Sequence, residues 1–349
     1  MQSALQWTAY PASQLQQFSS VWQSINVADL NMPVLDPRYL QPLLQHMGTG
    51  RELLVIGAMQ GQPRAAILVE QGRRGIWHSF EAGGCPFGAW VCDRELDREQ
   101  ALASLLRALP GFGMLIALTR QDPALTRRPN EQGRVRTVDY IETMSIRIDS
   151  DFDMFWKGRS KGFRQNIRTA LNRQNRDGIS ATFAEIADPE TLSAAVDAHG
   201  LLESASWKAG TGNALHPENT QGIFMRQAMC SLAESGNARA FQYRYDGRLV
   251  ASALCVDNGD AMIVLRTSFD EGEKFTSPGQ LMHYAMLQAL FEHRRFRIIE
   301  FYGAAMNWER QWTNESRVMY HLNLYRSPWL AMAHELLAKR KKGDSDCPS

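Results

Sequence analysis

The stretch Met262–Gly303 has the sequence MIVLRTSFDEGEKFTSPGQLMHYAMLQALFEHRRFRIIEFYG. It begins with a run of apolar and β-branched residues, 262–269, which predicts a buried strand. After a polar loop, Ser277-Pro278-Gly279-Gln280 predicts a helix start, because Ser is a favoured N-cap, Pro suits the first helical position and Gln completes a capping box. A second strand is predicted over 297–302. Strand, helix and strand in this order predict a βαβ unit.

The start of this helix is a candidate anion site. A helix N-terminus offers unpaired N–H groups and a partial positive charge, which together attract anions. Gly279 would let a ligand approach the backbone closely. The alternative is a capped core helix without a ligand, and on these grounds alone it is favoured, because capped helices are common and phosphate sites are few.

Further motifs occur at fixed places around this unit. They are Thr267-Ser268-Phe269-Asp270-Glu271, Ser277-Pro278-Gly279, Glu300-Phe301-Tyr302-Gly303, Trp308-Glu309-Arg310-Gln311-Trp312, Glu203-Ser204-Ala205-Ser206-Trp207-Lys208 and a basic run from Lys157 to Arg176. In this order and spacing the chain resembles the CelD/BioF2-like branch of the GNAT N-acyltransferase superfamily, a branch that is itself similar to the FemABX peptidyltransferases. The resemblance covers residues 145–326 well and the first part of the chain more loosely.

The composition describes an ordinary globular protein with two domains. The 349 residues exceed the usual size of one domain, and a hydrophobic fraction of 44% is enough for real cores. The net charge of +1 implies no global attraction to nucleic acid or to an anionic membrane, so such binding would need a local patch.

Cysteine usage and the lack of targeting signals favour a cytoplasmic protein. The five cysteines are scattered and form no CxxC pair, so we expect reduced thiols and no metal. The first thirty residues lack a basic region followed by an apolar core, and no apolar run is long enough to span a bilayer. The C-terminal tail contains Lys339-Arg340-Lys341-Lys342, for which a solubilising end is favoured over contact with a membrane surface.

The order of predicted elements is similar in the two halves of the chain. Each half shows helices, strands, a helix and a final strand, although no residue-level repeat is visible. We therefore expect an α/β fold with a mixed sheet, in the tandem GNAT-like (FemABX-like) architecture that the resemblance implies. The expected divisions are an N-terminal domain over 1–148, an acyltransferase domain over 149–328, and a C-terminal helix with a polar tail over 329–349. The glycine-rich segment 81–88 is no phosphate loop, because no Gly-Lys-Ser/Thr follows it.

The basic run predicts a helix with an apolar stripe at Phe163, Ile167 and Leu171. Seven cations occur between Lys157 and Arg176. They form either a solvated face or a contact with phosphate, and the two readings are evenly balanced. A coenzyme A phosphate, a nucleotide sugar or a tRNA acceptor stem would suit Lys157, Arg164 and Arg168 equally.

The resemblance implies direct acyl transfer from a thioester to an amine. In the GNAT fold the strand before the phosphate-binding helix carries a bulge whose backbone N–H polarises the thioester carbonyl, and by position this strand is 262–269. The expected acyl-CoA-binding residues are Arg266, Thr267, Ser268, Ser277, Gly279 and Gln280.

Candidate catalytic groups lie on neighbouring elements. Glu300 and Glu203 are candidate bases, and each of them has a structural alternative as a capping or pairing residue. Tyr302 is a candidate acid for the departing thiolate, with a buried, hydrogen-bonded tyrosine as the alternative. The expected substrate-binding residues are Trp207, Lys208, Trp308 and Trp312, whose aromatic members either stack on a sugar or belong to the core.

Two departures from the family pattern bear on function. A lysine that the family usually carries after its glycine is replaced here by Glu309, and the standard GNAT phosphate signature is absent. The first hypothesis is an acyl-CoA N-acyltransferase acting on an amine of a sugar, a polysaccharide precursor or a related metabolite. The alternatives are a FemABX-like transferase that uses aminoacyl-tRNA, and a non-catalytic GNAT scaffold accessory to envelope polysaccharide synthesis.

Overall fold

The computed structural model describes residues 5–273 and 275–345, and of residues 211 and 337–345 only the backbone; Cys347 lies outside the described residues. The first part of the chain forms β1 (Gln6–Pro11), η1 (Ala12–Phe18), α1 (Ser19–Ala28), η2 (Pro33–Leu35), α2 (Pro37–Met47), β2 (Leu53–Met59), β3 (Gln62–Gln71), β4 (Ile76–Ser79), β5 (Trp90–Cys92), α3 (Arg98–Ala108), β6 (Leu115–Gln121) and β7 (Val135–Arg147). The rest forms α4 (Phe152–Lys157), α5 (Lys161–Arg176), β8 (Ala181–Ile186), α6 (Pro189–Ser204), η3 (Trp207–Thr211), α7 (Thr220–Ala233), β9 (Ala238–Tyr245), β10 (Arg248–Asp257), β11 (Ala261–Phe269), η4 (Glu271–Glu273), α8 (Pro278–His293), β12 (Ile298–Phe301), α9 (Glu309–Trp312), β13 (Ser316–Tyr325) and α10 (Pro328–Ser345).

A single mixed sheet runs through the molecule, and its order is nearly a palindrome. The order is β1-β2-β3-β4-β6-β13-β7-β12-β11-β10-β9-β8, with β5 paired to β3. From either edge, three antiparallel pairings lead to one parallel pair, β4 with β6 in the first unit and β11 with β12 in the second. A helix, α3 or α8, connects each parallel pair. The structure therefore confirms the expected mixed-sheet α/β fold and its tandem architecture.

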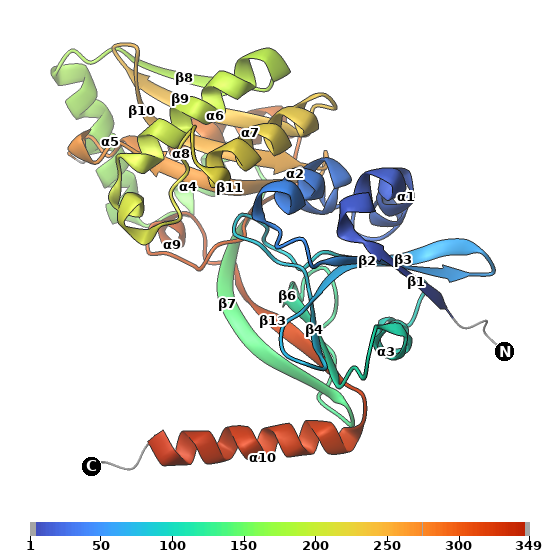
Figure 1. Cartoon of the computed structure of the whole chain (residues 1–349). Helices are drawn as coiled ribbons and strands as arrows, with labels where there is room; N and C mark the ends of the chain where they lie inside the picture. Colours follow the sequence, from blue (N-terminus) through green and yellow to red (C-terminus); the bar gives the residue numbers. More distant parts are fainter. Residues whose placement is uncertain (1–4, 274, 346–349) are drawn as a thin grey trace.

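The two units exchange their last strands at the centre of the sheet. β13 lies between β6 and β7, and β7 lies between β13 and β12, all in antiparallel pairs. These long, curved strands join the two halves of the molecule (Figure 1). A division after residue 148 stays a prediction, and backbone hydrogen bonds cross it on both sides of β7.

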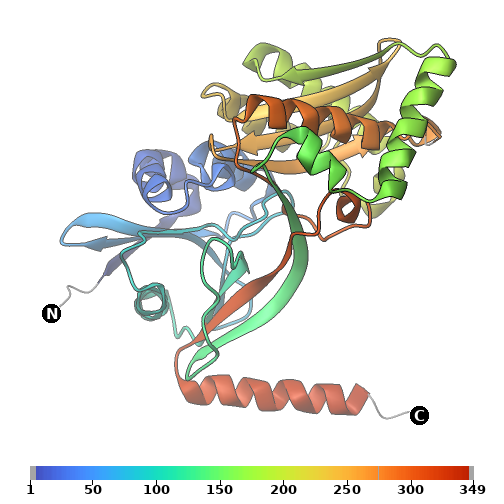
Figure 2. The ribbon, with the colours of Figure 1, turned by 180° about the vertical axis from the view of Figure 1, so that it is seen from behind.

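Helices cover both faces of the sheet and create three cores. α1 and α2 of the first unit pack with α6 and α7 of the second around one shared core. The second core lies under α4, α5 and α8, which are seen together from behind in Figure 2, and the third lies under α3. The shared core fixes the position of the first unit against the face of the sheet on which Ile263, Leu265 and Tyr302 lie.

The structure corrects several local predictions. The capping box at the start of α8 does not form, because Ser277 makes no side-chain capping hydrogen bond and its backbone is left-handed, with φ of 53°. The helix predicted for the basic run from Lys157 to Arg176 is interrupted: α4 ends at Lys157 and α5 begins at Lys161. β8 and α7 were not expected, although Met225, Ala228, Met229 and Leu232 on the buried face of α7 follow the spacing of an amphipathic helix. In the described part of the chain, no helix is both long and apolar enough to cross a membrane.

Candidate functional site

β11 and β12 separate soon after they begin to pair. Their parallel ladder runs from Ala261 to Ile263 on β11 and ends at the pair Ile263–Glu300. Beyond it, β11 continues to Phe269 with only β10 as a neighbour, whereas β12 ends at Phe301. The two strands thus open a wedge at the carboxyl end of the parallel pair, where ligands bind in open α/β sheets.

A β-bulge lies at this wedge. Arg266 pairs with Leu254 and Val264 pairs with Cys255, so that Leu265 is the extra residue of β11. The extra residue of a bulge is left out of the regular ladder, and here it lies in the part of β11 beyond the end of its pairing with β12. The bulge expected in this strand is present.

The start of α8 closes the outer end of the wedge. Pro278 has no N–H group, and the Leu281 N–H bonds to the Ser277 carbonyl oxygen. The first helical N–H groups without an acceptor among the described residues are therefore those of Gly279 and Gln280. A side chain at Gly279 would place its Cβ 3.3 Å from the ring of Phe269, the last residue of β11. The Gln280 side chain turns inward and accepts a 2.8 Å hydrogen bond from the indole of Trp312.

Glu300 belongs to a buried network that both units build. Arg317 on β13 donates to Glu300 at 2.7 Å and to both carboxylate oxygens of Asp122, which follows β6. Tyr302 donates its hydroxyl to Asp122 at 3.0 Å and packs its ring on Phe87. The hydrogen bond from Arg317 therefore fixes the orientation of Glu300, and the hydroxyl proton of Tyr302 is engaged in its hydrogen bond to Asp122.

Burial sets the acidities in this network. Desolvation raises the pKa of Glu300 from 4.5 to about 7, although Arg317 opposes the shift. Burial and the neighbouring carboxylates of Glu300 and Asp122 raise the pKa of Tyr302 well above its usual value. A carboxyl group with a pKa near 7 suits general-base catalysis at neutral pH.

Glu203 lies at the centre of a second buried cluster, which consists of ion pairs and hydrogen bonds. Its side chain has no exposed surface; it accepts from Lys208 Nζ at 2.8 Å and from the N–H of Leu215 at 2.9 Å. Arg266 lies 3.6 Å away, and Lys208 also donates to the carbonyl oxygen of Thr267. Burial alone would raise the pKa of Glu203, but Arg266, His199 and Lys208 together hold it below 4.5. These contacts indicate an anchor that ties the segment after α6 to the end of β11.

Replacement of Glu203 by glutamine is expected to destabilise the fold. The change leaves Lys208 and Arg266 without their shared carboxylate, and loss of one partner of a buried ion pair costs several kcal/mol. Because these cations are partly exposed, we expect a loss of about 2–3 kcal/mol in the free energy of unfolding, measured by urea denaturation at pH 7. The control is Glu190→Gln, an exposed position in the first turn of α6. An equal stability of both variants would show that Glu203 is no anchor.

The predicted substrate-binding tryptophans lie in different surroundings. Trp312 is fully buried in the core, so its ring has no face open to a stacked sugar. Trp308 is half-buried against His283 and Phe301. The side chain of Trp207 is 55% exposed, and its backbone N–H donates to the Glu271 carboxylate at 2.9 Å.

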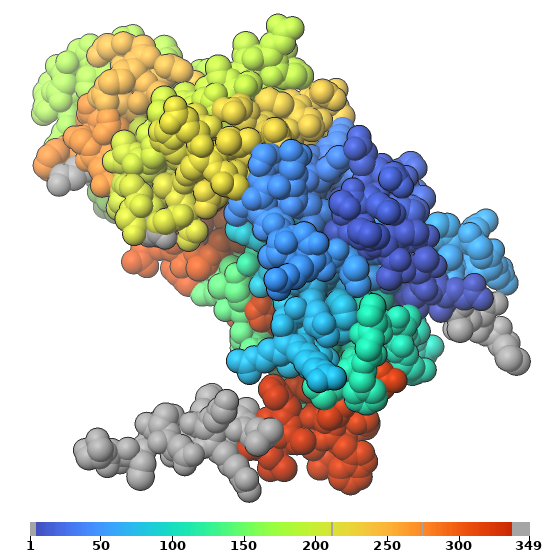
Figure 3. Space-filling view, viewed as in Figure 1, coloured from blue at the N-terminus to red at the C-terminus, as the bar shows by residue number. Residues whose placement is uncertain are grey.

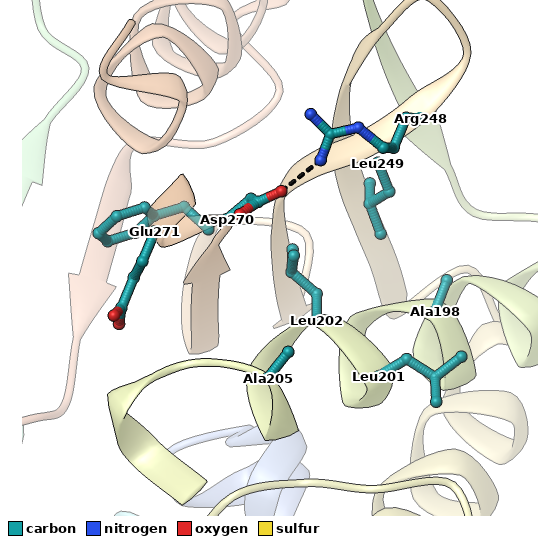
Figure 4. Close-up of a pocket in the computed structure, with 9 residues that line it drawn as sticks. Ala198, Leu201, Leu202, Ala205, Arg248, Leu249, Asp270 and Glu271 are labelled. Carbon is teal, nitrogen blue, oxygen red and sulfur yellow. Dashed lines mark hydrogen bonds and ion pairs between the residues drawn. The ribbon is translucent and has the colours of Figure 1, made fainter. Parts of the chain in front are cut away.

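Trp207 lies beside a hollow of about 350 Å³. The lining is mainly apolar and comprises Ala198, Leu201, Leu202, Ala205, Arg248, Leu249, Phe269, Asp270 and Glu271. Figure 4 shows α6 side chains on one wall and Arg248 reaching to Asp270 on the other. Ser268, expected to contact the donor, is buried, and its hydroxyl has no hydrogen-bond partner among the described residues.

Three residues in or near the site, Asp122, Arg317 and His283, were not predicted from the sequence as functional residues. Asp122 and Arg317 are 195 residues apart, and no local motif connects them. His283 is buried, and burial lowers its pKa to about 4. Its Nδ1 donates to the carbonyl oxygen of Gly279 at 2.7 Å, while Nε2 has no partner among the described residues. Spacing was the available signal for His283, because it follows Gly279 by one helical turn.

The equivalent wedge of the first unit is closed. The Ser79 and Thr119 hydroxyls, at the ends of β4 and β6, lie 3.0 Å apart. Gly88, from the glycine-rich segment 81–88, packs so tightly there that a Cβ would lie 2.1 Å from Ser79 Oγ. The open wedge of this pair of units is therefore the one between β11 and β12.

The chain matches the family model of the acetyltransferase (GNAT) domain over residues 161–343. This match spans more than half of the chain, which therefore belongs to the GNAT family and is an acyltransferase. The expected membership of the superfamily is thereby confirmed. No curated protein matches the chain with significance.

Solved structures share the fold at low identity. The C-terminal DUF2156 domain of a putative lysylphosphatidylglycerol synthetase from Agrobacterium fabrum is 14% identical, with a TM-score of 0.56 over 93% of this chain and 96% of that one. A conserved protein of unknown function from Bacteroides thetaiotaomicron is 9% identical, with a TM-score of 0.55 over 92% and 99%. The L-PGS of Bacillus licheniformis is 13% identical, with a TM-score of 0.50 over 83% and 92%. In the described residues no cluster of three or more His, Cys, Asp or Glu side chains is arranged to hold a metal.

Proposed function

We propose that the protein is an acyl-CoA-dependent N-acyltransferase whose site is the wedge between β11 and β12. The observation that carries the proposal is the combination of the Leu265 bulge, the open wedge and the helix start at Gly279 within one βαβ unit. The diphosphate of the donor would accept hydrogen bonds from the Gly279 and Gln280 N–H groups. The pantetheine arm would run along the free edge of β11 toward Leu265.

The transfer is a direct attack of the acceptor amine on the thioester carbonyl carbon. A C–N bond forms, the C–S bond breaks, and coenzyme A leaves as the thiolate. The Leu265 N–H stabilises the developing oxyanion. Glu300 takes the proton of the amine, a role that its pKa of about 7 favours over that of Glu203, which is held ionised and paired. Tyr302 can return a proton to the thiolate only after its hydrogen bond to Asp122 opens.

For the acceptor, we propose an amine of a sugar, a polysaccharide precursor or a related metabolite. The exposed Trp207 ring would provide a stacking face. The hollow lined by Glu271, which accepts a hydrogen bond from the Trp207 backbone N–H, would provide apolar walls for a sugar ring. Lys208 forms an ion pair with the buried Glu203, and we expect it to hold this segment in place without contacting the substrate.

A second candidate donor is an aminoacyl-tRNA. Along α4 and α5, Lys157, Lys161 and Arg168 are exposed, and Arg164 is half-buried. Arg173 donates to the carbonyl oxygen of Phe275, which ties this basic helix to the loop before α8. Phosphates bound along α5 would thus lie close to the same helix start.

Isothermal titration separates these donors. Acetyl-CoA, a long-chain acyl-CoA and free coenzyme A are titrated into the protein, and micromolar binding of at least one supports the proposal. Release of coenzyme A is then followed with a panel of amino sugars. If none of the three ligands binds, the acyl-CoA proposal is wrong, and filter binding of charged tRNA to wild type and to Arg168→Glu tests the second donor.

A further inference from the structure

Helix α10 lies at the far end of β7 and β13 (Figure 1), and its first turns, red in Figure 3, lie at the edge of the molecule. One side of its first turns is fixed to these strands. Ala331 is buried there, His334 Nδ1 lies 2.7 Å from the Tyr325 hydroxyl, and Glu335 pairs with Arg136. The orientation of the helix on the body is therefore defined.

The opposite side of α10 is apolar and open to solvent. Trp329 is 77% exposed, Met332 48% and Leu336 63%. Their spacings of three and four residues place them on one helix face. We call these three residues the apolar stripe of α10. Large side chains gathered on an exposed face mark an interaction site rather than chance exposure.

The sequence of α10 continues with four consecutive cations, Lys339-Arg340-Lys341-Lys342. An apolar stripe that includes tryptophan, followed by a basic tract, is the combination that attaches a helix to the interface of an anionic bilayer. The apolar side chains enter the boundary between headgroups and acyl chains, while each Lys or Arg gains from the negative surface potential.

We propose that α10 lies on the surface of an anionic membrane and attaches the enzyme there peripherally. The charge of the tract favours this occupant over a second copy of the chain, because pairing two copies in parallel would oppose eight like charges. The stripe also extends over only two turns, shorter than a stable coiled coil requires. The proposal is independent of the donor and acceptor used by the wedge.

Vesicle co-sedimentation tests the proposal on the full-length protein. Vesicles of phosphatidylcholine are compared with vesicles of phosphatidylcholine and phosphatidylglycerol. We expect at least about tenfold stronger partitioning to the anionic vesicles, and weaker binding as salt rises. The variants Trp329→Ser and Lys341→Glu/Lys342→Glu should each lower this partitioning about tenfold or more.

Matched control variants distinguish attachment through α10 from non-specific binding to vesicles. Val27→Ser removes an exposed apolar side chain on α1, and Arg51→Glu reverses an exposed charge in the loop before β2; both should bind like wild type. Circular dichroism checks that each variant is folded. Absence of binding to anionic vesicles, or equal binding by stripe variants and controls, overturns the proposal. So does light scattering that shows a dimer lost in Trp329→Ser, because a second copy would then cover the stripe.

Discussion

Replacing Glu300 by glutamine is expected to lower kcat/KM for acyl transfer about 10²–10⁴-fold, the usual contribution of a general base. Glutamine keeps the size of the side chain and a hydrogen bond to Arg317 but cannot take the proton of the amine. The donor Kd, measured by titration, should stay unchanged, because Glu300 lies at the base of the wedge and not at the helix start. The rate is read from coenzyme A release with an accepted amine.

The pH profile identifies the base. Since the pKa of Glu300 is about 7, wild-type kcat/KM should rise about tenfold per pH unit up to pH 7 and then level off. Glu300→Gln should lose this rise. Glu309→Gln is the matched control: Glu309 is also buried, burial raises its pKa to about 7, and its carboxylate accepts from the Met306 N–H rather than from Arg317. A profile altered by Glu309→Gln and not by Glu300→Gln would reverse the assignment.

As the pH rises toward 7, the stability that the protonated Glu300 gives to the fold should fall, whereas kcat/KM should rise. The pKa of Glu300 in the folded protein lies above its ordinary value of 4.5, so the folded state binds this proton more tightly than the unfolded state. Its contribution is therefore fully present below pH 4.5 and declines as the pH rises toward 7. At pH 8 the Tm of Glu300→Gln should equal or exceed that of wild type, with the difference vanishing near pH 5. A residue kept for catalysis at a cost in stability shows this pattern.

Replacing Gly279 by tyrosine is expected to weaken the binding of coenzyme A and its thioesters about 100-fold, or about 2.7 kcal/mol. The new side chain must displace the Phe269 ring and covers the N–H groups of Gly279 and Gln280. Titration with coenzyme A measures the loss.

The control for this prediction is Gly162→Tyr. Gly162 also lies in the first turn of a helix, α5, and a Cβ there meets no atom within 4 Å. Unchanged affinity in Gly279→Tyr would remove the helix start from the donor site. Weakened affinity in both variants would instead implicate the basic helix.

The elements of the site that are contiguous in the sequence could be predicted from it. The contacts between residues far apart in the sequence could not. The βαβ unit is encoded within the 42 residues from Met262 to Gly303 by apolar runs, a glycine and a proline, so its strands and helix can be predicted locally. The capping box failed because hydrogen-bonding types at the right spacing do not fix the backbone angle of Ser277. Asp122 meets Arg317 only through the exchange of β13 between units, and nothing in either local sequence encodes that contact.

The charged neighbours of the two buried candidate acids distinguish them. Glu203 and Glu300 are the same residue type near the same strand, and their sequence contexts do not distinguish them. Arg266 and Lys208 hold the first ionised, while desolvation raises the pKa of the second. Environment, rather than residue type, decides which carboxyl group can exchange a proton at neutral pH.

The exchanged strands also determine when the protein can fold during its synthesis. The sheet of the first unit is incomplete until β13, made almost 200 residues after β6, inserts between β6 and β7. Contacts of such long sequence separation form slowly. The first unit must therefore wait, with an open sheet edge, until β13 has left the ribosome. Such an edge invites aggregation, so we expect folding in the cell to depend on chaperones that shield β6 and β7 during this delay.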